Sequence, residues 1–132
     1  MSTYLCIDPG LSHTGVAISS SVNLAEPLTT IHTKDPDKTL ERVLSIINER
    51  GPDQVIIGQP LFGPIRSLSQ DLFNALKLQF SGPIHLFPED LSSKIASQKL
   101  IQSGNKKQNR DDKKHAAAAA VILQDFLESP SI

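Results

Sequence analysis

The chain has 132 residues, of which 39% are hydrophobic and 20% charged, and its formal net charge is −1. These values are ordinary for one soluble globular domain over residues 1–132. No apolar run approaches the ~20 residues of a membrane span, the start lacks the charged n-region of a signal peptide, and Cys6 is the only cysteine. Composition therefore excludes a membrane protein and a disulfide scaffold, and we expect a cytoplasmic protein. Aromatic residues make up 5% of the chain, without tryptophan, which argues against a base-stacking platform.

Three β-type segments open the chain. Residues 3–7 form an apolar run that ends at the turn sequence Asp8-Pro9-Gly10. Residues 16–18 and 25–32 follow, and Pro27 favours an edge position for the third strand. The short connections between the three predict antiparallel neighbours.

A helical pattern begins at Asp35, a good N-cap followed by Pro36, and Gly51 ends it. A compact strand over 54–58 comes next. Ser67 and Gln70 have the spacing of a capping box and predict the start of a second helix.

The last third predicts a strand over 83–87, a helix over 91–103, a polar basic loop, and an alanine-rich helix over 112–127. The order β-β-β-α-β-α-β-α-α predicts an α/β fold. Three antiparallel strands and then βαβ crossovers form a five-stranded mixed sheet, flanked by helices on both faces.

Two acids end strands of this sheet. Asp8 follows the first strand, and Glu89 follows the strand over 83–87. Because α/β sheets place ligands at the carboxyl ends of their strands, we expect the two carboxylates to meet there and bind Mg²⁺ or Mn²⁺. Such ions act as Lewis acids on phosphoryl groups. Taken singly, Asp8 also suits a turn and Glu89 a helix N-terminus.

The third ligand is left open among Asp111, Asp112 and His115, which lie at the entry to the last helix. Asp111 lies four residues before His115 and Asp112 lies three residues before it, so either aspartate can share a helix face with His115. It also precedes the apolar face that should pack on the sheet. The alternatives are an N-cap for either aspartate and a half-buried structural side chain for His115.

Residues 94–114 hold seven basic residues and two acids, a local surplus of five positive charges. Such a surplus suits a polyanion, although charge runs are often only solvated surface. Lys106, Lys107 and Arg110 are the candidate nucleic-acid contacts. Arg66, in the loop after the strand over 54–58, is a candidate phosphate contact, and His13 lies between Asp8 and Gly15 in a turn.

Several motifs resemble the YqgF/RuvX group of the RNase H-fold superfamily, in the same order and at similar spacing along nearly the whole chain. They are DPG at 8–10 with GVAI at 15–18, AEPLTTI at 25–31, VIIGQPL at 55–61, EDLSS at 89–93 and AAAVILQDFL at 118–127. The resemblance implies a metal-dependent nuclease with Asp8 and Glu89 as its acids. It also implies a role in 5′ maturation of precursor 16S ribosomal RNA.

The chain departs from the family pattern at three places. His115 stands where the family usually has aspartate, and it could not bind a metal ion when protonated, below about pH 6.5. Pro88 and Asp90 replace the usual neighbours of the second acid, and the loop after VIIGQPL is shortened.

Two other functions fit the same residues. One is a Holliday junction resolvase-like DNA nuclease that acts as a dimer. The other is a degenerate RNA-binding assembly factor without cleavage activity. Nucleotide phosphotransfer is disfavoured because the actin-like ATPase fold needs a duplicated domain. The sequence leaves open whether the protein is a monomer or a homodimer.

Overall fold

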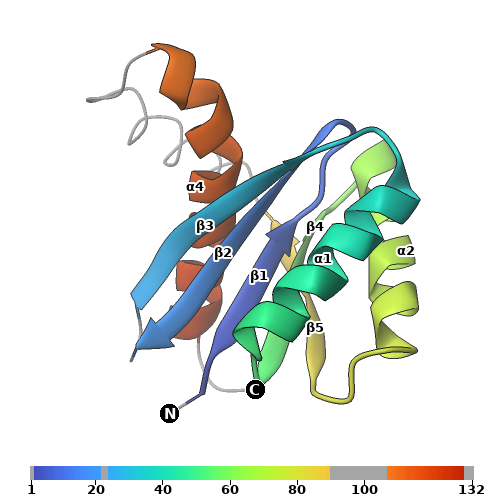
Figure 1. The fold of residues 1–132 in the computed structure, drawn as a ribbon, viewed down its shortest axis with the longest axis vertical. Helices are drawn as coiled ribbons and strands as arrows, with labels where there is room; N and C mark the ends of the chain where they lie inside the picture. Colours follow the sequence, from blue (N-terminus) through green and yellow to red (C-terminus); the bar gives the residue numbers. More distant parts are fainter. Residues whose placement is uncertain (1, 22–23, 90–106, 130–132) are drawn as a thin grey trace.

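The computed structural model describes residues 2–21, 24–89 and 107–129. Its centre is a five-stranded sheet in the order β3-β2-β1-β4-β5. Figure 1 shows the sheet with α1 and α2 on one face and α4 on the other. The predicted five-stranded mixed sheet flanked by helices is confirmed.

The first three strands form the antiparallel half of the sheet. They are β1 (Tyr4–Asp8), β2 (His13–Ser21) and β3 (Leu24–His32). β4 (Gln54–Pro60) and β5 (Ile84–Glu89) add to β1 in parallel. β3 is an edge strand, as Pro27 predicts, and its pairing with β2 shifts register next to that proline because proline has no N–H for the ladder.

Strand alternation divides the apolar side chains between two cores. Leu5 and Ile7 of β1 belong to the core under α1 (Pro36–Arg50) and α2 (Pro64–Lys77). Cys6, between them, belongs to the core under α4 (Lys107–Glu128), and it is fully buried as expected. Residues of even number in β1 therefore face α4.

The ends of α1 agree with the prediction. The Asp35 side chain accepts a hydrogen bond from the Asp37 N–H at 2.9 Å. At the other end, Gly51 has a left-handed backbone with φ 58°, a conformation that glycine adopts without steric cost.

Two predicted helix starts are wrong. α2 begins at Pro64, three residues before Ser67, and its N-cap Gly63 makes no side-chain capping bond. Proline fits the first helical position because it needs no hydrogen-bond partner for nitrogen, so it overrides the apparent capping box. α4 begins at Lys107 and not at Asp112, since no glycine or proline interrupts residues 107–112. The predicted helix over 91–103 lies outside the described residues.

No helix among the described residues is long and apolar enough to cross a membrane.

Candidate functional site

Asp8 occupies the carboxyl end of the central strand β1. Its side chain is only 4% exposed, and its even position places it on the α4 side of the sheet with Cys6. The Oδ1 atom is buried and makes no hydrogen bond within the described part of the chain, although the residue has another interaction. Burying a carboxylate is costly unless a polar or charged group compensates it, and a buried aspartate at the end of the central strand is a candidate functional residue.

Gly15 brings α4 close to Asp8. It pairs with Asp8 across β1 and β2, and a Cβ atom at Gly15 would overlap the backbone carbonyl of His115. Only a residue without a side chain lets the helix approach the strand this closely. The structure therefore brings two predicted site residues, Asp8 and His115, to neighbouring positions on one face of the sheet.

Three histidines gather beside this position. The rings of His13 and His115 are stacked, with centroids 4.8 Å apart and an interplanar angle of 5°. The His32 ring meets the His13 ring edge-on at 4.8 Å, as their register pairing across β2 and β3 allows. The Ser12 Oγ lies 3.1 Å from the Nδ1 atom of His13.

Glu89 is the last residue of β5 and lies at the same edge of the sheet. Ile7 is paired with Ile57 of β4, and Pro60 of β4 with Glu89, so Glu89 is two residues further along than Asp8. Two strand spacings and this offset separate the two Cα atoms by about 12 Å on a flat sheet. Two extended acidic side chains with an ion between them can bridge that span.

The remaining predicted ligands and basic contacts are only partly described. The backbones of Lys107, Arg110, Asp111 and Asp112 belong to α4, so Lys107 and Arg110 are helical and not in a loop, and Asp112 is not the N-cap. Their side chains, the Glu89 side chain and all of Lys106 lie outside the description. Among the side chains described, no group of three His, Cys, Asp or Glu residues could hold a metal ion.

Arg66 organises the loop between β4 and α2. Its Nη1 atom donates to the carbonyl oxygens of Pro60 at 3.2 Å and Leu61 at 3.5 Å. The Gln59 amide donates in turn to the Arg66 carbonyl at 3.3 Å. The guanidinium thus has a structural role, and a phosphate contact from its other nitrogens stays a prediction.

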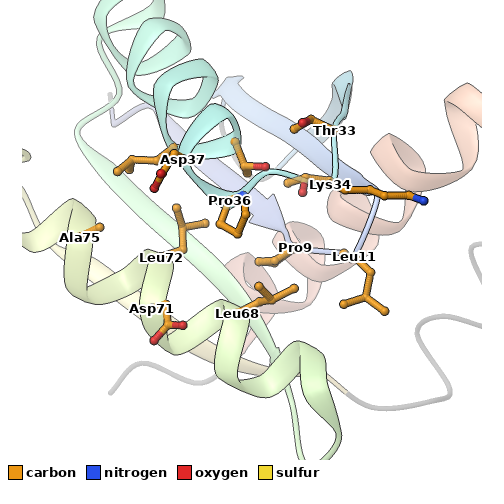
Figure 2. A pocket seen from close by; sticks show the side chains of 14 residues that line it. Pro9, Leu11, Thr33, Lys34, Pro36, Asp37, Leu68, Asp71, Leu72 and Ala75 are labelled. Carbon is orange, nitrogen blue, oxygen red and sulfur yellow. The ribbon is translucent and has the colours of Figure 1, made fainter.

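A pocket of about 200 Å³ opens on the other side of the sheet (Figure 2). It lies between the turn after β1, the start of α1 and one side of α2, and Leu68, Leu72 and Pro36 line it. Neither Asp8 nor His115 lines this pocket. It is therefore separate from the candidate site, although Pro9 and Gly10 form part of its wall.

The donor set at the carboxyl edge suits Mg²⁺ or Mn²⁺. Hard divalent ions take carboxylate oxygens, and manganese also accepts an imidazole nitrogen. Asp8 offers a buried carboxylate, and His115 lies across Gly15 from it. Asp8 and His115 are thus two donors of the kind that such an ion takes, and a complete ligand set would also need Glu89 or the acids of α4.

The sequence did not single out the histidine cluster. The sequence suggests His13 as a possible substrate contact in a turn, whereas the structure places it at the start of β2, and the sequence does not indicate His32. One sequence signal could have indicated His13. It is two residues before Gly15 and four before Ala17, so on a strand all three lie on the same face, the one that packs against α4. The pairing of His13 with His32 depends on register, which the sequence does not determine.

Comparison with known proteins places these features in context. A family model described as "RuvX: Holliday junction resolvase" matches residues 2–129. A protein of Chloroflexus aurantiacus named "Putative pre-16S rRNA nuclease" is 34% identical over 131 residues, covering 95% of this chain and 86% of the relative. A relative of the same name from Geobacillus kaustophilus is 35% identical and covers 95% and 96%.

Solved structures agree on the fold. RuvC of T. thermophilus in complex with a Holliday junction substrate superposes with a TM-score of 0.62 at 15% identity, covering 94% of this chain and 92% of the other. The Fowlpox virus Holliday junction resolvase gives a TM-score of 0.63 at 16% identity and covers 97% and 99%. These proteins share the RNase H-like fold, which confirms the fold expected from the sequence.

Proposed function

Because this chain belongs to the RuvX family, we propose that it is a nuclease that hydrolyses phosphodiester bonds at the carboxyl edge of β1. The observation that carries the proposal is the buried Asp8 carboxylate at the end of the central strand, with the His115 backbone packed against its neighbour Gly15. Two chain segments that are remote in sequence converge there, on the sheet edge where this class of fold binds ligands.

We assign Asp8, Glu89 and His115 as the catalytic residues and as ligands of Mg²⁺ or Mn²⁺, with Asp112 or Asp111 as a further ligand. The ion would supply Lewis acidity toward the phosphoryl group. Asp8 is held rigidly by its strand, so it fixes the ion relative to the sheet. His115 is held by the stacked His13 ring, and Glu89 approaches from β5.

The substrate class follows from the relatives. Those that match over nearly the whole chain are named as pre-16S ribosomal RNA nucleases, so we propose precursor 16S ribosomal RNA and a role in maturation of its 5′ end. Lys106, Lys107 and Arg110 would contact the RNA backbone. This role implies a cytoplasmic location.

A Holliday junction resolvase-like activity is the second candidate. The description of the family model and the likeness to junction-resolving structures favour it. It requires two sites acting on two strands, so it predicts a homodimer and tight binding to four-way junctions. The RNA proposal requires neither.

The test is cleavage of precursor 16S ribosomal RNA by purified protein with Mn²⁺. We expect wild-type protein to cleave near the mature 5′ end and Asp8→Asn to lose at least about 100-fold, since one ligand of the ion is neutralised. Asp71→Asn, which changes an exposed acid on α2, is the control and should cleave normally.

Each outcome selects one function. Equal cleavage by wild type and Asp8→Asn would exclude the proposed site. RNA binding without metal-dependent cleavage would point instead to a non-catalytic assembly factor. Cleavage of four-way junctions but not of RNA would favour the resolvase activity.

A further inference from the structure

Exposed apolar side chains are concentrated at the edge of the sheet that carries Asp8. In the part of the chain that the structure describes, five large apolar side chains are exposed: Leu11, Leu24, Leu61, Phe62 and Leu78. Three of them, Leu11, Leu61 and Phe62, lie on the loops that follow β1 and β4. Phe62 is the one aromatic residue among the five, and it is 79% exposed.

The loop that carries Phe62 is short and well anchored. Only three residues connect Pro60, the end of β4, to Pro64, the start of α2. The Arg66 guanidinium bonds two carbonyls at the start of this loop, and Gly63 turns it with φ 96°. The buried Ser69 hydroxyl donates to the Gly58 carbonyl at 2.8 Å, which ties the first turns of α2 to β4.

The same loop adjoins the proposed catalytic edge. Pro60 of β4 is paired with Glu89 of β5. Phe62 lies two residues after Pro60, so it is close in sequence to the strand position next to that acid. The Phe62 ring is exposed on a loop that is anchored by hydrogen bonds. Covering this apolar ring with a flat nucleobase removes apolar surface from water, which is favourable. Little conformational entropy is lost on binding, because the loop is already ordered.

We propose that Phe62 is a stacking platform for an unpaired nucleobase of the substrate, next to the bond that is cut. The proposal rests on the proposed nuclease function and adds a preference for single-stranded segments. Stacking on an aromatic ring tolerates any base because every base has a π-face. The exposed Arg66 at the foot of the loop can also attract the adjacent phosphate.

A nucleobase suits this surface better than a protein partner does. Stable protein interfaces bury about 800 Å² on each side, whereas Leu61 and Phe62 are only two exposed side chains on this loop. The low aromatic content predicted no stacking platform. The proposal departs from that prediction, because one ring is sufficient for one base.

The absence of tryptophan from the chain allows a direct test. Phe62→Trp places the sole indole at the proposed contact, and its emission should fall by about half or more when single-stranded RNA stacks on it. Leu78→Trp is the matched control. Leu78 is 87% exposed at the opposite end of α2, about 20 Å away along the helix, so its emission should stay constant.

Affinity provides a second measurement. Anisotropy of a labelled single-stranded RNA should show about 10-fold weaker binding for Phe62→Ala, the loss expected when one base loses its aromatic partner. Phe62→Tyr should bind like wild type, and Leu78→Ala should have no effect. Binding of a blunt duplex should be the same for these three variants as for wild type.

Three results would overturn the proposal. The first is RNA binding by Phe62→Trp at wild-type affinity with unchanged emission. The second is emission that changes with protein concentration alone, which would assign the ring to contact with a second copy of the chain. The third is equal weakening of duplex and single-strand binding by Phe62→Ala. If wild-type protein binds no RNA at all, the proposed function fails first, and this inference fails with it.

Discussion

The His13 ring lies flat against the His115 ring, and its other neighbours hold it in that position. His32 meets it edge-on, and Ser12 lies within hydrogen-bond distance of its Nδ1 atom. Because His13 packs against the proposed ligand His115, His13 would be a positioning residue. Its contribution should show in how tightly the metal is held, because such outer contacts fix the orientation of the ligating imidazole.

We expect His13→Ala to raise the Mn²⁺ concentration that gives half-maximal cleavage by about 10-fold, the typical cost of losing such a contact. The maximal rate should recover at high metal. His13→Phe keeps a flat ring and should behave nearly like wild type. The measurement is the cleavage rate as a function of Mn²⁺ concentration.

His85→Ala is the matched control for this prediction. His85 lies on β5, bonds Gln54 at 2.8 Å and contacts the Phe126 ring, so its loss should leave the metal dependence unchanged. A lower maximal rate of His13→Ala with an unaltered metal dependence would contradict the positioning role.

At the level of single elements, substitutions of Ser67 and Ser69 test which serine stabilises the start of α2. The Ser69 hydroxyl is fully buried and donates to the Gly58 carbonyl, whereas Ser67 is exposed within the helix. Ser69→Ala leaves a buried carbonyl without this partner and should lower the free energy of unfolding by about 1–3 kcal/mol. Ser67→Ala should be neutral or slightly stabilising, since alanine is the better helix former. Urea denaturation measures the free energy of unfolding of both variants. A decrease of about 1 kcal/mol in Ser67→Ala would mean that Ser67 caps the helix after all.

Gly15 controls the distance between β2 and α4. Gly15→Ala would force its Cβ atom against the His115 backbone, so α4 must shift or the strand must bend. We expect a loss of about 1–3 kcal/mol in the free energy of unfolding, as in other overpacked sites. Displacement of His115 should also raise the Mn²⁺ concentration that gives half-maximal cleavage. Ser20→Ala, at an exposed position of the same strand, is the control. Unchanged stability and activity of Gly15→Ala would contradict the close approach.

The sequence predicted those features that depend on local chemistry. The strand runs, the Asp35 cap and the Gly51 stop depend on neighbouring residues. The structure confirms the cap, the stop and the five strands, although β2 spans His13–Ser21 and not residues 16–18 alone. The start of α2 was wrong because two signals, Pro64 and the Ser67 spacing, competed at nearly the same place. Asp8 could be singled out because a carboxylate ends an apolar strand. The contact of His13 with His115 could not, since it depends on how α4 crosses β2.

At the scale of the whole molecule, charge is distributed unevenly along the chain. Residues 94–114 carry a surplus of five positive charges, while the net charge is −1. The remainder of the chain therefore holds six more acids than bases. Part of the basic segment is the first turns of α4, where Lys113 and Lys114 are exposed, on the side of the sheet that Asp8 faces. The first turns of α4, residues 107–114, hold four basic residues and two acids, so we expect a polyanion to be attracted to these turns more than to the rest of the described chain.

This asymmetry predicts how RNA binding depends on salt. Each phosphate contact of a single strand contributes about 0.7 to the slope of log affinity against log salt. Replacing Lys106, Lys107 and Arg110 together by alanine should therefore reduce the slope by up to about 2 if all three contact phosphates. The matched control replaces Lys38, Arg42 and Arg50, three exposed basic residues of α1 on the opposite face of the sheet. That variant has the same net charge, so it should keep nearly the wild-type slope. Equal reductions in both variants would mean that RNA responds only to total charge, and that the α4 side is not its binding surface.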